Sequence, residues 1–227
     1  MASKSGSQDS NYHHGNLKQA LIEAYLELLS TVSADKLSLR KLAAQVGVAP
    51  TAVYNHFADK EELVVAVKTR CLFHFADYLE TGVEKAERPR DKIRNLGKAY
   101  FQYSIEYEQF FSILFTTEVE DKYITEDLIE GSMRAEGALR ASVVELLEEN
   151  NLPTSQYNEG LGAFACWSLA HGITSLAGIR INRAACAMGR WPPEFMLDNN
   201  ETVLQVFDSM TSVLVEGILA TARKNTG

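Results

Sequence analysis

The segment LRKLAAQVGVAPTAVYNHFADK (39–60) constrains the fold more than any other part of the chain. Two short stretches with an apolar face, Leu39–Val46 and Pro50–Phe57, flank a Gly-Val-Ala turn. Gly47 stands where a helix can end in the left-handed conformation that favours glycine. Pro50 stands in the first turn of a helix, where its missing N–H is not needed. The segment therefore predicts two short helices joined by a tight turn.

Such a pair is a helix-turn-helix unit, whose second helix enters the major groove of duplex DNA with its N-terminus first. We expect Ala43 at the crossing of the two helices, where a larger side chain would separate them, and Val48 at the corner. The expected inward face consists of Leu39, Leu42, Val46, Val53 and Phe57. The alternative is a helical hairpin that only packs.

Small and polar side chains occupy the outward face of the second helix and its flanks. Tyr54, His56 and Lys60 are suited to donate to phosphate oxygens. Arg40 and Asn55 are suited to base edges, and the methyl group of Thr51 or Ala52 to a thymine methyl. The predicted DNA-binding residues are Arg40, Thr51, Ala52, Tyr54, Asn55, His56 and Lys60.

The charge distribution limits the kind of DNA binding. The chain has a net charge of −8, yet residues 1–60 contain six lysines and arginines and five acidic residues. The acidic excess therefore lies in the remainder of the chain. This balance argues against a protein that coats DNA indiscriminately, while a near-neutral head can still present a local cationic face.

The rest of the chain reads as helical throughout. Five prolines separate segments with helical period, and the 227 residues contain only 14 glycines. We predict an all-α fold of about nine helices, with a three-helix head and a larger C-terminal helical domain. The predicted division is a disordered leader (1–13), a helix-turn-helix domain (14–60) and an effector-binding and dimerisation domain (61–227). Expected helices follow a cap at Asn16 and a cap at Asp59 with Glu62, and the later ones span Lys92–Tyr107, Glu126–Glu149, Tyr157–Ile181 and Glu201–Arg223.

The motif residues resemble the TetR/AcrR family of transcriptional regulators. The resemblance rests on Leu39-Arg40, Ala43, Gly47-Val48, Tyr54-Asn55-His56-Phe57 and Lys60. Tyr12 to Leu17 and Trp167-Ser168-Leu169-Ala170-His171-Gly172 also resemble a subgroup named for a Trp…His-Gly signature. The resemblance implies a DNA-binding head and a ligand-binding, dimer-forming body. The family commonly has serine before the second helix, where this chain has Ala49 and forfeits about 1 kcal/mol of helix capping.

The last two long helices predict a homodimer. Tyr157–Ile181 is apolar nearly all round and rich in small residues, so it must be covered on every side. Glu201–Arg223 spaces its apolar residues at four and three, as in a helical bundle. A bundle of two helices from each of two subunits covers both. The alternative is that both helices are buried within one subunit.

An effector pocket is expected between the helix that begins at Lys60, Lys92–Tyr107 and Tyr157–Ile181. The predicted lining residues are Phe73, Tyr78, Tyr103, Tyr107, Phe111, Phe164, Trp167 and His171. Aromatic surface with a few polar tips favours a flat or aromatic apolar effector over a sugar phosphate. Trp167 and His171 equally suit packing. Two or three of the clustered aromatic residues Tyr100, Phe101, Tyr103, Tyr107, Phe110, Phe111 and Phe115 are expected to face the pocket.

These patterns predict a cytoplasmic, homodimeric repressor that leaves a palindromic double-stranded DNA operator when a small molecule binds. No catalytic arrangement, metal site or cofactor motif is visible, so we expect no enzyme. Neither an apolar run of about 18 residues nor a signal sequence is seen, so no membrane is expected as a partner. Cys71, Cys166 and Cys186 are expected to pack as free thiols, and His13-His14 to lie in the solvated leader rather than bind metal or a minor groove. The rival classes are an enzyme and a DNA-binding adaptor whose helical domain binds a protein and no ligand.

Overall fold

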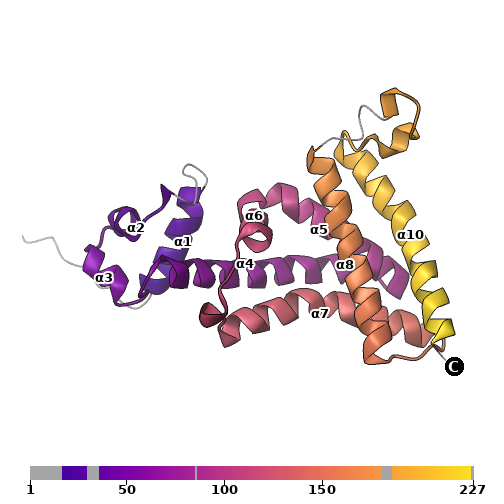
Figure 1. Cartoon of the computed structure of the whole chain (residues 1–227), viewed down its shortest axis with the longest axis horizontal. Helices are drawn as coiled ribbons and strands as arrows, with labels where there is room; N and C mark the ends of the chain where they lie inside the picture. The colour runs from indigo at the N-terminus through magenta and orange to yellow at the C-terminus, as the bar shows by residue number, and fades with distance from the viewer. Residues whose placement is uncertain (1–16, 30–35, 85, 180–185, 226–227) are drawn as a thin grey trace, which may run out of the picture.

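The computed structural model describes residues 17–29, 36–84, 86–179 and 186–225. The described residues form nine α-helices and two short 3₁₀ helices and contain no strand. The all-α prediction, with a small head and a larger helical domain, is confirmed (Figure 1). The predicted cap at Asn16 and the leader with His13-His14 lie outside the described residues.

Three helices build the head: α1 (Leu17–Leu29), α2 (Leu39–Val46) and α3 (Pro50–Tyr54). Their shared core is apolar and buried, with Ala43 fully enclosed where α2 meets its neighbours. The predicted inward face is buried at Leu39, Leu42, Val53 and Phe57 and half-buried at Val46. Gly47 ends α2 with φ 76° and ψ 30°, the left-handed conformation that its position predicts.

The long helix α4 (Lys60–Val83) carries the chain from the head into the body (Figure 1). Its start is the predicted capping pair. Asp59 Oδ1 accepts the Glu62 amide N–H at 2.8 Å, and Glu62 Oε2 accepts the Ala58 amide N–H at 2.6 Å. The first bond satisfies an amide that the first turn of the helix leaves unpaired, and the second fixes the residue that precedes the cap.

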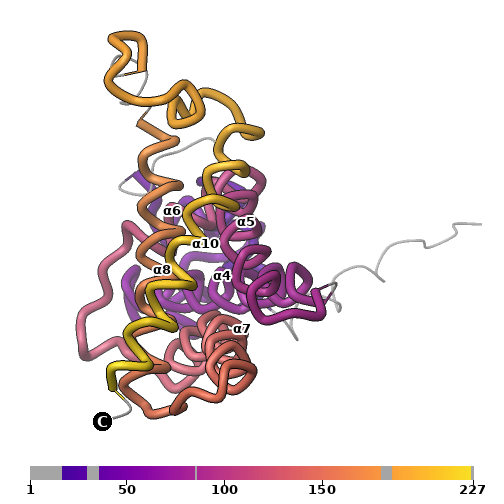
Figure 2. Tube along the Cα trace, turned by 90° about the vertical axis from the view of Figure 1, so that its right-hand side faces the viewer, coloured from indigo at the N-terminus to yellow at the C-terminus, as the bar shows by residue number. Residues whose placement is uncertain are grey.

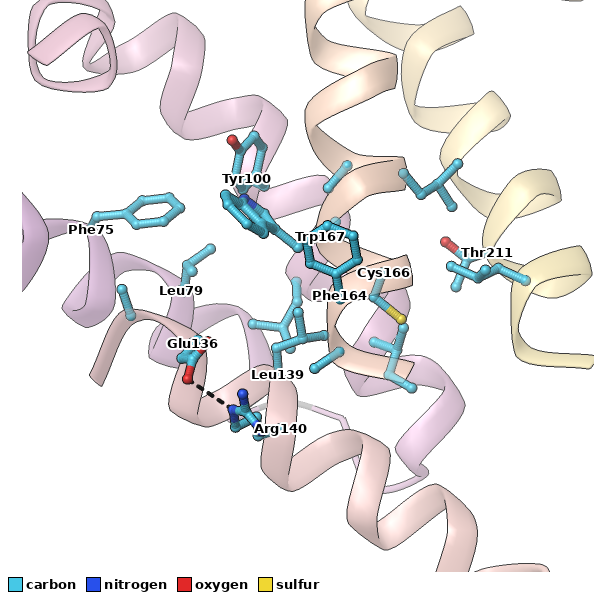
Figure 3. A pocket seen from close by; sticks show the side chains of 18 of the residues that line it. Phe75, Leu79, Tyr100, Glu136, Leu139, Arg140, Phe164, Cys166, Trp167 and Thr211 are labelled. Carbon is cyan, nitrogen blue, oxygen red and sulfur yellow. Dashed lines mark hydrogen bonds and ion pairs between the residues drawn. The ribbon is translucent and has the colours of Figure 1, made fainter. Parts of the chain in front are cut away.

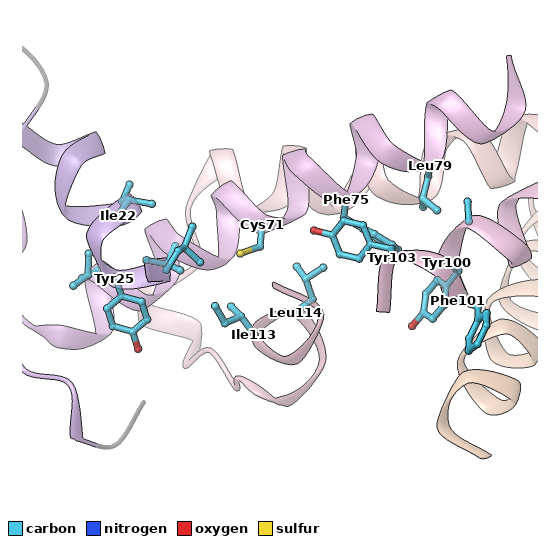
Figure 4. Close-up of a cluster of buried hydrophobic side chains, with 14 of the residues drawn as sticks. Ile22, Tyr25, Cys71, Phe75, Leu79, Tyr100, Phe101, Tyr103, Ile113 and Leu114 are labelled. Atoms are coloured by element: carbon cyan, nitrogen blue, oxygen red, sulfur yellow. The ribbon is translucent and has the colours of Figure 1, made fainter. Parts of the chain in front are cut away.

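The centre of the body is formed by α4 with α5 (Pro89–Glu106), α6 (Glu108–Thr116) and α7 (Glu126–Glu149). A short 3₁₀ helix, η2 (Asp121–Tyr123), connects α6 to α7. One buried cluster runs from the head along α4 into the body, so Tyr25 of α1, Cys71 of α4 and Ile113 of α6 belong to the same core (Figure 4). The head and the body therefore share packing.

The outer layer, at the end opposite the head, consists of α8 (Gln156–Ile179) and α10 (Asn200–Lys224), side by side (Figures 1 and 2). The 3₁₀ helix η3 (Pro193–Met196) lies in the connection that projects beyond them. Within the described residues, α10 is the one helix long and apolar enough to cross a membrane, and 39% of its apolar window is buried. Its buried side packs Val203, Phe207, Val215 and Leu219 into the core.

Candidate nucleic-acid interface and cavity

The second helix of the helix-turn-helix is shorter than predicted. It was expected over Pro50–Phe57, but α3 ends at Tyr54 and Asn55 is its C-cap. The amide N–H groups of His56 and Phe57 both donate to the Val53 carbonyl, at 2.9 and 3.0 Å, and the Phe57 ring is buried. The helix therefore ends three residues before its predicted bound. The Ala49 cap makes no side-chain hydrogen bond, as its missing hydroxyl predicts.

The predicted DNA-binding residues lie together on the surface around α3. Arg40, Thr51, Tyr54, Asn55 and His56 are exposed, and the Tyr54 ring is 53% exposed despite its size. Ala52 and Lys60 are half-buried. A large ring left in solvent on a short polar helix is typical of a recognition surface. The arrangement offers hydrogen-bond donors and methyl groups to a groove.

The body contains a cavity of about 340 Å³ lined by side chains of α4, α5, α6, α7, α8 and α10 (Figure 3). It lies between the three helices that the sequence analysis named. Most of its wall is apolar, including Phe75, Leu79, Leu139 and Phe207. A small concave site with apolar walls and few polar groups is suited to a small organic molecule.

Several of the polar groups on the cavity wall are already paired. The Tyr100 hydroxyl lies 2.8 Å from Nδ1 of His171. Burial raises the pKa of Tyr100, so its proton stays on the hydroxyl and is available to His171. Arg140, at the edge, pairs with Glu136 at 2.8 Å and Glu159 at 3.0 Å. The wall therefore presents little unpaired polarity to a ligand.

Of the eight predicted lining residues, Phe164 and Trp167 lie on the cavity wall. His171 and Phe111 form a layer behind it, against the rings of Tyr100 and Phe115. The other four do not line this cavity. Tyr103 and Tyr107 pack on His74 and Tyr78 packs on both tyrosines, in an aromatic cluster that meets the cavity wall through Phe75, and Phe73 lies beside Gly131 of α7.

Two members of the aromatic sequence cluster, Tyr100 and Phe115, line the cavity, as the expectation of two or three required. The wall also includes residues that sequence reasoning missed, among them Leu139, Arg140 and Thr211. Aliphatic residues at helical spacing carry no signal that separates a cavity wall from a filled core.

The three cysteines are buried free thiols. Burial raises the pKa of Cys71 and of Cys166 to about 12, so neither holds a reactive thiolate at neutral pH. Across the described residues, no group of three or more His, Cys, Asp and Glu side chains gathers as a metal site.

The sequence of the head matches known DNA-binding regulators. Residues 21–67 match the family model described as "Bacterial regulatory proteins, tetR family". An uncharacterized HTH-type transcriptional regulator of Haemophilus influenzae is 45% identical over 47 residues, which are 20% of this chain and 23% of that protein. The chain thus matches about a quarter of that relative's length.

Solved structures share the whole fold. A protein of unknown function from Rhodococcus sp. RHA1 has a TM-score of 0.70 and 21% identity, covering 92% of this chain and 98% of its own. A TetR family transcription regulator from Marinobacter aquaeolei VT8 has a TM-score of 0.56 and 17% identity, covering 86% and 93%. The likeness extends over both the head and the helical body.

Proposed function

We propose that this chain, whose head matches the tetR family model over residues 21–67, is a TetR-family transcriptional regulator and a homodimeric repressor of a palindromic operator. We further propose that a small apolar molecule in the cavity releases it, and that it acts in the cytoplasm. The observation that carries DNA binding is the exposed polar surface of α3 on a packed helix-turn-helix. A regulator of this class has no catalytic role for its side chains.

Each exposed residue receives a role from its chemistry. Tyr54, His56 and Lys60 position the head on phosphate oxygens, while Arg40, Thr51 and Asn55 read base edges and Ala52 contacts a thymine methyl. Exposure at the end of α3 supports the assignment of Asn55 and His56, because the shortened helix still leaves both side chains in solvent.

The exposed stripe of α8 supports a homodimer. Tyr157, Leu161, Phe164, Ser168 and Gly172 follow one another at helical spacing, all at least partly exposed and none charged. Phe164 is 63% exposed. Beside it, α10 exposes the small residues Ser209, Ser212, Val213, Gly217 and Ala220. A second copy of the same pair of helices would cover this surface, as in a two-fold bundle.

The cavity supports a neutral, apolar effector. Tyr100 pairs with His171, and Arg140 already has two carboxylate partners. A charged ligand would have to leave water without a free partner there, and burying an unpaired charge is strongly unfavourable. An effector that binds equally well whatever the position of the heads would shift nothing, so release requires a difference in affinity.

DNA binding is tested with duplexes selected from a random pool by the purified protein. We expect the best palindrome to bind well above random duplex at moderate salt, with affinity falling steeply as salt rises. Equal affinity for both would contradict the proposal.

Residue roles are tested with three variants. Lys60→Ala should weaken all duplexes alike and reduce the salt slope by about one unit, whereas Asn55→Ala or Arg40→Ala should cost about 1–3 kcal/mol and relax preference at one position. An altered sequence preference in Lys60→Ala with an unchanged salt slope would overturn these assignments.

The effector site is tested by thermal shift with a panel of neutral aromatic and aliphatic compounds. We expect Trp167→Ala to lose the thermal stabilisation that a binding compound gives the parent, because Trp167 lines the cavity wall. Phe111→Ala should lose less of this stabilisation, because Phe111 lies in the layer behind the wall. A parent dimer that binds operator and responds to no compound would favour the adaptor. Two variants that respond as the parent does would place the pocket elsewhere.

A further inference from the structure

The segment between α6 and α7 contacts the joint between the head and the body. It passes through η2 and brings the Tyr123 hydroxyl to 2.6 Å from Oδ2 of Asp59. A hydroxyl that donates to a carboxylate at this distance makes a short, charge-assisted hydrogen bond. Asp59 is the residue that separates the head from α4, so this bond ties the base of the head to a distant part of the body.

Asp59 uses its two oxygens for two different tasks. Oδ1 caps α4 by accepting the Glu62 amide N–H at 2.8 Å, and Oδ2 accepts the Tyr123 hydroxyl. The Tyr123 hydrogen bond, followed by the cap, holds the pKa of Asp59 below its ordinary value, so the acceptor is ionised at neutral pH. The cap and the tie can therefore be separated by mutation.

The segment that carries Tyr123 is itself anchored. Lys68 Nζ of α4 donates to the Thr117 carbonyl at 2.6 Å, where the segment begins. Lys122 pairs with Glu120 at 3.1 Å and lies over the Tyr123 ring, 4.8 Å from its centroid. Thr125 then caps α7 through the Leu128 amide at 3.2 Å. Tyr123 thus projects from a fixed support.

The head has another tie to the body, through α1. Arg70 of α4 lies 3.4 Å from Glu23, and Ile22 and Tyr25 share the core with Ile113 of α6 (Figure 4). A rigid unit held at one place can still rotate about it, and a second tie removes that rotation. Tyr123 supplies the second tie, because its partner Asp59 lies close in the chain to the end of α3.

We propose that Tyr123 is a positioning residue for DNA recognition, whose hydrogen bond to Asp59 sets the angle of the head on the body. In a dimer this angle sets the separation of the two recognition helices. The inference rests on the proposed function, because it concerns two heads on one palindrome.

The test is a series of operators whose half-sites are moved apart by one and two base pairs. Each added base pair shifts a half-site by about 3.4 Å and also rotates it about the duplex axis. We expect the parent to prefer one spacing sharply. In Tyr123→Phe the loss of affinity on adding one base pair should be at least about threefold smaller, with the half-site sequence preference unchanged.

Asp59→Asn is the second variant. Asparagine caps a helix as well as aspartate does, so Oδ1 keeps its role, while the amide nitrogen that replaces Oδ2 can only donate to the Tyr123 oxygen, and the short charge-assisted bond becomes a weaker neutral one. This variant should broaden the spacing preference in the same way.

Thr125→Ala is the matched control, because it removes a hydroxyl and a helix cap two residues away and leaves the Tyr123 bond in place. It should keep the spacing profile of the parent. A parental profile in both Tyr123→Phe and Asp59→Asn would overturn the inference, as would an equal broadening in Thr125→Ala. Failure of the parent to prefer any palindrome over random duplex would overturn the proposed function as well, and the parent alone reveals it.

Discussion

At the scale of single residues, Gly47 has a backbone conformation that few other residues adopt. Its φ of 76° places it in the left-handed region, and a Cβ built there would meet no atom within 4 Å. Any cost of a side chain is therefore backbone strain and not crowding.

We expect Gly47→Ala to lower the free energy of unfolding by about 1–2 kcal/mol, the cost of a left-handed alanine. Gly47→Asn should lose less, because asparagine tolerates this conformation. Urea unfolding of both variants checks the order, and an alanine variant as stable as the asparagine variant would contradict it.

The surroundings of His74 predict that the stability of the protein depends on pH. Burial chiefly, and then Arg70, lower the pKa of His74, while Asp77 and Glu23 oppose the shift. Above the ordinary histidine pKa of about 6.5, both the folded and unfolded states are neutral here. As the pH falls below that value the unfolded state binds the proton first, so the free energy of unfolding falls until the folded pKa is passed.

In His74→Gln this part of the pH dependence should disappear, because glutamine does not titrate and can still accept the Tyr103 hydroxyl. The measurement is the urea midpoint at about pH 7.5 and about pH 5 in both proteins. An equal drop in both would show that His74 contributes nothing to it.

At the scale of helices, Gly162 allows α8 to approach α7. A Cβ at this position would lie 2.7 Å from Cγ1 of Val143, a buried side chain of α7. Real side chains do not approach so closely, so a side chain at position 162 requires that one helix shifts or that Val143 is replaced by a smaller residue.

Gly162→Ala should therefore lower the free energy of unfolding by about 1–3 kcal/mol, in spite of the better helix propensity of alanine. Combining it with Val143→Ala should cost less than the sum of the single changes, because the smaller residue opens the space. Additive losses in the double-mutant cycle would refute this explanation.

The helices themselves could be predicted from local signals. The period, the prolines and the caps gave Leu39–Val46 and Glu126–Glu149 the bounds that the structure has, and predicted the Asp59–Glu62 capping pair. The early end of α3 could not be predicted, because the inward placement of Phe57 does not decide whether the amides of His56 and Phe57 continue the helix or both turn to the Val53 carbonyl.

The cavity could be predicted only in part. The aromatic residues of α5 point to different surroundings: Tyr100 lines the cavity, whereas Tyr103 is enclosed beside His74. Helical spacing alone does not decide which side faces empty space, since that depends on how six helices pack around it.

At the scale of the whole molecule, two helical glycines with open space around them can show which surface a second subunit covers. A Cβ at Gly172 of α8 or at Gly137 of α7 would meet no atom within 4 Å in one subunit. In a monomer both should accept alanine with a gain of up to about 1 kcal/mol in helix stability.

If α8 forms the subunit interface, the two positions must differ. We expect Gly137→Ala to be neutral or stabilising, and Gly172→Ala to weaken the dimer at least about tenfold, because a methyl group enters a close helix contact. Analytical ultracentrifugation over a dilution series measures both. Dimers of equal strength would exclude a close contact at Gly172.

The uninterrupted helix α4 would convert a small tilt at the cavity into a displacement of the head. The cavity-lining Phe75 lies 15 residues along α4 from Lys60, which gives a lever arm of about 22 Å between the cavity and the head. A tilt of about 5° at the cavity moves the start of α4 by about 2 Å. If the proposed dimer holds two such arms about a two-fold axis, a small widening of the cavity by the proposed ligand would take both heads out of register with the DNA.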